Sequence, residues 1–226
     1  MKSKLRLLKE YFNSKKEVKT DNFKITEISA ERKGSFVPSS AICVNSALKQ
    51  LIEEGDIDDK GLFLDAGCGD GRIIALTAGI FNIPSLGVEF DAEVSGIAEK
   101  SIDDLSTILD FKKENAVVIK GDFTEDNTYE KAGIRFENIK TVFNYINNSK
   151  DIAKKIAEQS PEGTVFLLLD TCFIPMEFPG LKLEKSLKGL ADLSKTTKKG
   201  YYDGIGNLNL KFMDVPYSIN MYVYRK

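Results

Sequence analysis

The sequence predicts an α/β fold with a doubly wound, mostly parallel seven-stranded sheet that ends in an antiparallel hairpin. Between residues 62 and 170, apolar runs alternate with segments of helical period. Such runs are typical of parallel strands that helices cover on both faces. Near the C-terminus, LNLKF (208–212) and YSINMYVY (217–224) alternate in polarity and are separated only by a short turn. That connection is too short for a helix, so the two strands are expected to pair antiparallel.

The individual elements follow from the same periodicities. The five parallel strands are expected at residues 62–66, 85–90, 116–122, 140–146 and 164–170. Helices are expected over residues 5–12, from 41 onward, over 72–80, after Asp91, after Ser149 and, as a short piece, within 183–194. Ser39 or Ser40, Asp91 and Ser149 are the expected N-caps, because short polar side chains accept from the first helical N–H groups.

Composition indicates a globular protein with one main domain. The chain has 226 residues, 42% of them hydrophobic, and a net charge of −2. We expect a basic helical extension over residues 1–35 and a single domain over 36–226. Residues 1–33 carry ten Lys or Arg against five acids, and residues 181–200 carry six Lys against two acids. These basic flanks leave RNA open as a partner, although solvated surface is the simpler interpretation.

Cysteine and histidine usage narrows the chemistry. The three cysteines are far apart in the sequence and form neither a disulfide framework nor a zinc pattern, which favours a reducing, cytoplasmic setting and no metal. No apolar run is long enough for a membrane span, so no membrane association is expected. The chain has no histidine, which excludes every mechanism that depends on imidazole.

The stretch FLDAGCGDGRII (63–74) places three glycines at alternate positions between a strand and a helix. A strand, a bare turn and a helix start together form a nucleotide-cofactor site. Dinucleotide sites use G-x-G-x-x-G, whose third glycine permits tight helix packing. Arg72 occupies that position here and is too large for it, whereas Asp65 precedes the first glycine by two residues.

This arrangement resembles the seven-β-strand (class I) S-adenosylmethionine (SAM) methyltransferases, whose fold is Rossmann-like. The resemblance implies that Asp65 lies near the cationic amino-acid part of SAM and that Glu89 accepts the ribose hydroxyls. Phe90 would cover the adenine and Asp122 would accept from its amino group. The cofactor residues implied are Asp65, Gly67, Cys68, Gly69, Gly71, Glu89, Phe90, Asp122 and Phe123. Their expected strand ends meet at one edge of the sheet.

Upstream, SFVPSS (35–40) followed by a helix and the glycine turn resembles the small archaeal and mitochondrial protein-lysine methyltransferases that lack a SET domain. The resemblance implies that Phe36, Pro38 and Ser39 form part of the lid over SAM. It also implies a protein substrate and places Asn144, Tyr145 and Asn147, in VFNYINNS (142–149), beside the methyl acceptor.

The sequence is compatible with several kinds of methyl acceptor. Lysine needs no imidazole, because an apolar channel raises its neutral fraction and water can take the proton. Asn144, Tyr145 and Asn147 are then orienting groups rather than bases. The stretch matches the N-P-P-Y motif of other amino-methyltransferases poorly, since both prolines are missing. The alternatives are an RNA or small-molecule methyltransferase and a SAM-binding protein without catalysis.

Overall fold

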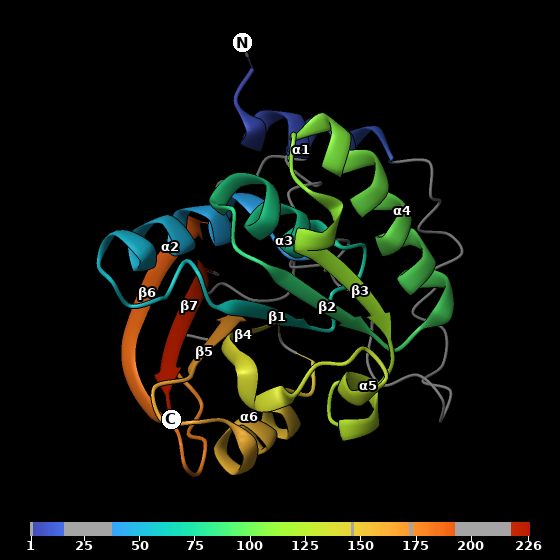
Figure 1. Cartoon of the computed structure of the whole chain (residues 1–226). Coiled ribbons are helices and arrows are strands. Elements are labelled where there is room, and N and C mark those ends of the chain that lie inside the picture. Colours follow the sequence, from blue (N-terminus) through green and yellow to red (C-terminus); the bar gives the residue numbers. More distant parts are fainter. Residues whose placement is uncertain (1, 16–37, 146, 172–173, 193–217) are drawn as a thin grey trace, which may run out of the picture.

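The structure is a computed structural model that describes residues 2–15, 38–145, 147–171, 174–192 and 218–226. Its seven-stranded sheet has the order β3-β2-β1-β4-β5-β7-β6 (Figure 1). The strands are β1 (Leu62–Ala66), β2 (Ser85–Glu89), β3 (Ala116–Lys120), β4 (Ile139–Tyr145), β5 (Val165–Asp170), β6 (Lys182–Asp192) and β7 (Ser218–Arg225). β1 to β5 are parallel, and β7 pairs antiparallel with both β5 and β6. The predicted fold class is therefore confirmed.

Helices cover both faces of this sheet (Figure 1). One face carries α1 (Lys4–Ser14), α2 (Ala41–Glu53), α3 (Arg72–Leu76) with its π-helical continuation η1 (Thr77–Phe81), and α4 (Ala92–Ile108). The other face carries α5 (Asp126–Glu130) and α6 (Ser149–Gln159). Short 3₁₀ turns, η2 (Lys113–Asn115) and η3 (Phe136–Asn138), lead into β3 and β4. In the described part of the chain, no helix is both long and apolar enough to cross a bilayer.

The strands divide the core into two clusters, because alternate side chains of a strand point to opposite faces. Phe63, Phe143 and Leu167 pack with the α1–α4 layer, whereas Leu64, Val142 and Leu168 pack with α5 and α6. Each parallel strand is thus apolar on both faces. Only the strand ends are left for polar, functional residues.

Two expectations about the C-terminal half are wrong. The segment expected as a short helix within 183–194 contributes to β6, an edge strand with an irregularity between Leu187 and Ala191. β7 corresponds to the strand expected over 217–224. It pairs with β5 on one side and with β6 on the other, so its antiparallel partner at the sheet edge is residues 182–192. The stretch 208–212, which was expected to fill that role, lies outside the described residues.

The predicted helix caps are confirmed in two of three places. The Ser40 hydroxyl accepts from the Cys43 N–H, and Asp91 accepts from the N–H groups of Glu93 and Val94. The third is wrong, because α6 begins at Ser149 itself and its N-cap is Asn148, with a φ of 54°. A left-handed Asn tolerates this turn better than most residues do.

Candidate functional site

The glycine turn joins β1 to α3 through a left-handed backbone. Gly67, Gly69 and Gly71 have φ values of 90°, 55° and 80°. Residues with a Cβ rarely adopt such angles, and glycine does so without strain. The sequence GCGDG therefore specifies the shape of the turn.

Most amide groups of this turn already have partners within the protein. The N–H groups of Gly67 and Cys68 both donate to the Val88 carbonyl at 3.0 Å. Gly69 N donates to the Glu89 carboxylate at 3.0 Å, and Gly71 N donates to the Cys68 carbonyl at 3.0 Å. A pyrophosphate site needs free N–H groups. The turn is consequently poorly suited to a dinucleotide.

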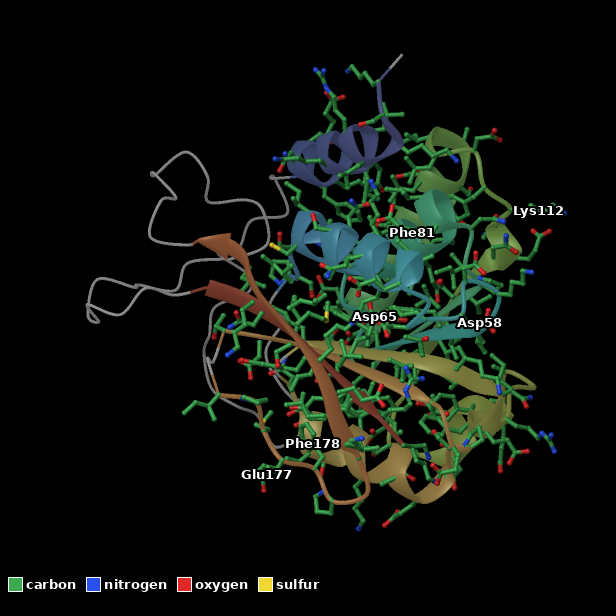
Figure 2. All side chains as sticks on the ribbon, turned by 90° about the vertical axis from the view of Figure 1, so that its left-hand side faces the viewer. Asp58, Asp65, Phe81, Lys112, Glu177 and Phe178 are labelled. Carbon is green, nitrogen blue, oxygen red and sulfur yellow. The ribbon has the colours of Figure 1, made fainter. Side chains whose placement is uncertain are left out.

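Carboxylates, in contrast, are abundant around the turn. Asp65 is only 3% exposed and lies deep inside the molecule (Figure 2). Burial raises the pKa of Asp65 well above its usual value of 3.8, and the charges of Glu89 and Asp70 raise it further. Burial also raises the pKa of Glu89, against hydrogen bonds from the N–H groups of Asp91 and Gly69. Carboxylates that converge around the buried Asp65 favour a cationic ligand, because a positive charge restores their ionised forms.

Gly71 and Cys68 pack against other parts of the protein. A Cβ on Gly71 would lie 3.2 Å from the carbonyl oxygen of Ala98 in α4, so this glycine permits close packing of the turn on α4. It takes the packing role that Arg72 cannot take. The Cys68 side chain packs against Gly87 of β2, where a Cβ would come within 2.7 Å of its sulfur. Burial, followed by the charge of Asp65, raises the pKa of the Cys68 thiol well above its usual value, so it stays neutral.

The residues predicted for the adenine end follow β2 and β3. Phe90 is 40% exposed, which suits a ring that covers a flat ligand. One oxygen of Asp122 accepts from both the N–H and the hydroxyl of Thr124, at 2.9 and 2.7 Å. Phe123 is buried, and its ring lies 3.9 Å from the position of a Cβ on Gly67. The Phe123 ring therefore packs against the glycine turn at Gly67.

Of the three predicted lid residues, two are described. Pro38 is half-buried and Ser39 is buried at the start of α2. The Ser39 carbonyl accepts from the Arg72 guanidinium at 3.3 Å, which ties this segment to the glycine turn. Phe36 lies outside the described residues.

The predicted acceptor residues separate at the end of β4. Asn144 is 2% exposed, and its amide nitrogen donates to the Ala66 carbonyl at 2.8 Å. Its Oδ1 has no hydrogen-bond partner among the described residues. Tyr145 faces the α1–α4 layer instead, and burial raises its pKa to about 12, with Asp170 as the next cause. Asn147 follows in the turn, where its N–H donates to the Tyr145 carbonyl at 2.7 Å.

Asp170 is a candidate that the sequence analysis missed. It ends β5, is 8% exposed, and accepts from the Thr171 N–H at 2.6 Å. Asn144 pairs with Leu168 in the sheet, and alternate residues share a face, so Asn144 and Asp170 lie on the same side of adjoining strands. The sequence did contain a signal for Asp170. TVFLLLD (164–170) is an apolar run that ends in an acid, and LFLDA (62–66) has an acid one residue before its end. No motif drew attention to it.

The described residues contain no group of three or more His, Cys, Asp or Glu side chains arranged to hold a metal ion. The polar residues that gather at the carboxyl edge of the sheet are Asp65, Glu89, Asp122, Asn144 and Asp170. Carboxyl ends of parallel strands are where open α/β sheets bind ligands. The edge divides into a carboxylate-lined half beside β1 and β2 and a second half beside β4 and β5.

Comparison with known proteins places this geometry in a family. Residues 43–159, about half of the chain, match the profile of the family described as histone methylation protein DOT1. No curated protein matches the sequence.

Two solved structures with TM-scores above 0.5 share the fold at low identity. A geranyl diphosphate methyltransferase in complex with GPP and sinefungin is 10% identical, covers 99% of each chain and has a TM-score of 0.55. A point variant of MtNAS in complex with S-adenosylmethionine is 10% identical, covers 98% of this chain and 72% of its own, and has a TM-score of 0.53. An RNA methyltransferase from Salinibacter ruber, in complex with S-adenosyl-L-homocysteine, is 18% identical, covers 80% and 90%, and has a TM-score of 0.49. At these identities the likeness concerns the fold alone.

Proposed function

Because the chain belongs to the family of histone methylation protein DOT1, which is a family of class I SAM-dependent methyltransferases, we propose that it methylates a nitrogen acceptor, with a protein lysine side chain favoured. The proposal of a nitrogen acceptor rests mainly on one observation. The Oδ1 atom of Asn144 is buried and has no hydrogen-bond partner among the described residues. A buried acceptor atom without a donor is costly, so a ligand N–H is its natural complement.

The residues around the glycine turn fit SAM. When bound, SAM supplies a methyl group on a sulfonium sulfur, which is a good leaving group. Asp65 complements the positive charge of the amino-acid part, and Glu89 offers two carboxylate oxygens to the ribose hydroxyls. Phe90 covers the adenine beside Asp122. The scarcity of free N–H groups in the turn further favours this cation over a dinucleotide.

On the acceptor side, orientation is the main contribution of the protein. The Asn144 amide is fixed by its bond to Ala66 O, so its oxygen is already aimed when an amine arrives. Asp170 attracts a cationic acceptor such as a lysine ammonium. Tyr145, with a pKa of about 12, stays protonated near neutral pH and therefore cannot be the base. Water takes the proton that the amine must lose.

The acceptor class can be tested by methyl transfer into cell extract. The purified protein is incubated with methyl-labelled SAM and extract, and the products are digested with RNase or with protease. We expect label that survives RNase, is released by protease and is recovered as methyl-lysine after hydrolysis. Label removed by RNase would favour an RNA substrate, and SAM binding without label in either fraction would favour a non-catalytic protein.

An Asn144→Ala variant links this assay to the site. It should lower kcat by about 100-fold, the loss typical of one preorganised polar contact to the reacting group. Its dissociation constant for SAM should stay close to that of the wild type, because the carboxylates beside the turn are untouched. An unchanged kcat would remove Asn144 from the acceptor site.

A further inference from the structure

The Arg72 side chain joins three segments that are far apart in the sequence. Its guanidinium forms a two-pronged ion pair with Asp70, with Nε–Oδ1 and Nη2–Oδ2 distances of 2.9 and 2.5 Å. It also donates to the Ser39 carbonyl before α2, and it lies 4.9 Å from the ring centre of Phe12 in α1. One side chain therefore touches the glycine turn, the segment before α2 and the N-terminal helix.

Helix α1 is docked at defined points and is not simply a basic appendage. Leu8 is fully buried in the core cluster of this face. Lys4 donates to the Gly79 carbonyl at 3.0 Å, and the Tyr11 hydroxyl donates to Asp104 of α4 at 2.7 Å. These contacts fix α1 so that Phe12 presents its ring to Arg72. A guanidinium over an aromatic face is attracted to it, and the stacking restricts the rotamers of the arginine.

The position of Arg72 matters for the cofactor site because Asp70 belongs to the glycine turn. Asp70 stands between Gly69 and Gly71, the two turn residues with φ values of 55° and 80°. The side chains of Asp70 and Arg72 are 14% and 13% exposed, so their ion pair is shielded from solvent. A bidentate arginine fixes the direction in which its partner carboxylate points. Loosening Arg72 would therefore free the turn beside Gly69.

We propose that Arg72 is a positioning residue for cofactor binding, and that α1 holds it in place through Phe12. Helix α1 is then part of the cofactor site, although it contributes no residue to the crevice itself. The inference rests on the proposed function, because it takes the ligand of the turn to be SAM. It adds that the affinity for SAM depends on the N-terminal helix.

Four proteins test this: the wild type, Phe12→Leu, Arg72→Lys and Tyr11→Phe. Phe12→Leu removes the aromatic face but stays apolar, and Arg72→Lys keeps the charge but loses the planar fork. Tyr11→Phe is the matched control, because it removes another docking contact of α1 and leaves Arg72 untouched. The dissociation constant for SAM is measured by calorimetry, beside the melting temperature and the KM and kcat of methyl transfer.

We expect Phe12→Leu to raise the dissociation constant for SAM about fivefold and Arg72→Lys about tenfold, with KM for SAM rising in parallel and kcat unchanged at saturation. Tyr11→Phe should lower the melting temperature while the dissociation constant stays within about twofold. Equal effects of Phe12→Leu and Tyr11→Phe on SAM binding would overturn the inference, as would wild-type affinity in Arg72→Lys. Failure of the wild type to bind SAM would instead overturn the proposed function, and the inference with it.

Discussion

Asp65 shows how burial and charge at one residue can favour one kind of ligand. Its carboxyl group is buried, and Glu89 and Asp70 add negative charge nearby. Burial and these neighbouring charges disfavour the ionised form of Asp65, which raises its pKa. A cationic ligand reverses this balance and favours the ionised carboxylate.

The first prediction concerns pH. Since the pKa of Asp65 in the folded protein is raised above its usual value of 3.8, the native state holds a proton that the unfolded state releases. The ligand-free protein should therefore lose stability as pH rises from about 4 through the raised pKa. SAM binding should release protons and should tighten as pH rises through the same range. Calorimetry in buffers of different ionisation enthalpy measures the proton count.

Asp65→Asn provides the matched comparison. This variant should bind SAM more weakly, release fewer protons on binding and show a flatter dependence of melting temperature on pH. A remaining slope is expected from Glu89, whose pKa is also raised. Proton release identical to that of the wild type would show that Asp65 does not lie beside the charge of the ligand.

The second prediction concerns Asp170 and the acceptor. Asp170→Asn should raise KM for a lysine peptide about tenfold, because the attraction of a carboxylate for an ammonium is lost. The dissociation constant for SAM should not change, since Asp170 lies at the β4–β5 side of the edge. Asp170→Glu should recover part of the affinity for the peptide. Steady-state kinetics at varied concentrations of the lysine peptide measures KM for both variants. An unaltered KM in Asp170→Asn would exclude this residue from the acceptor site.

At the scale of elements, the close contact between the glycine turn and α4 constrains the packing of the cofactor half. Gly71 has a φ of 80°, and a Cβ there would lie 3.2–3.3 Å from backbone and side-chain atoms of Ala98. The turn and α4 therefore fit only when position 71 has no side chain. This packing explains why the sequence contains a third glycine even though its N–H is used internally.

The third prediction compares two glycines of similar backbone angle. Gly71→Ala should lower the free energy of unfolding by about 2–4 kcal/mol, from left-handed strain together with overpacking against α4. Gly55→Ala has a φ of 76° at a position with no atom within 4 Å, so it should lose only about 1 kcal/mol. Urea denaturation measures both. Equal losses would mean that the contact with α4 contributes nothing.

At the scale of the whole molecule, the sequence was sufficient for the parallel half of the sheet. β1, β2, β4 and β5 are predictable because strands buried on both faces leave continuous apolar runs, and the edge strand β3 still reads as an apolar run. The acids at the strand ends mark the carboxyl edge of the sheet. β6 was mistaken for a helix because Leu183, Leu187 and Leu190 recur at helical spacing. In the structure this segment pairs with β7, so the sheet rather than the local leucine spacing decides its conformation.

The places of Asp65 and Glu89 at strand ends follow from the sequence, whereas their roles toward SAM come from the family resemblance and stay predictions. The contact between Phe12 and Arg72 depends on how α1 docks. No local pattern encodes that docking. Asp170 lies between these cases, since its strand was predicted but its side of the sheet follows only from the register with β4.

The central claim is that the carboxylate-lined half of the sheet edge beside β1 and β2 binds SAM, and calorimetric titration of the purified protein with SAM tests it most directly. Gly69→Arg is the matched variant, because it places a long side chain in the turn beside Glu89. We predict one SAM per chain for the wild type, and no binding for Gly69→Arg, which should stay folded with a melting temperature lowered by the few degrees that a side chain at a left-handed φ costs. Absence of binding to the wild type, or equal binding to a folded Gly69→Arg protein, would contradict the account.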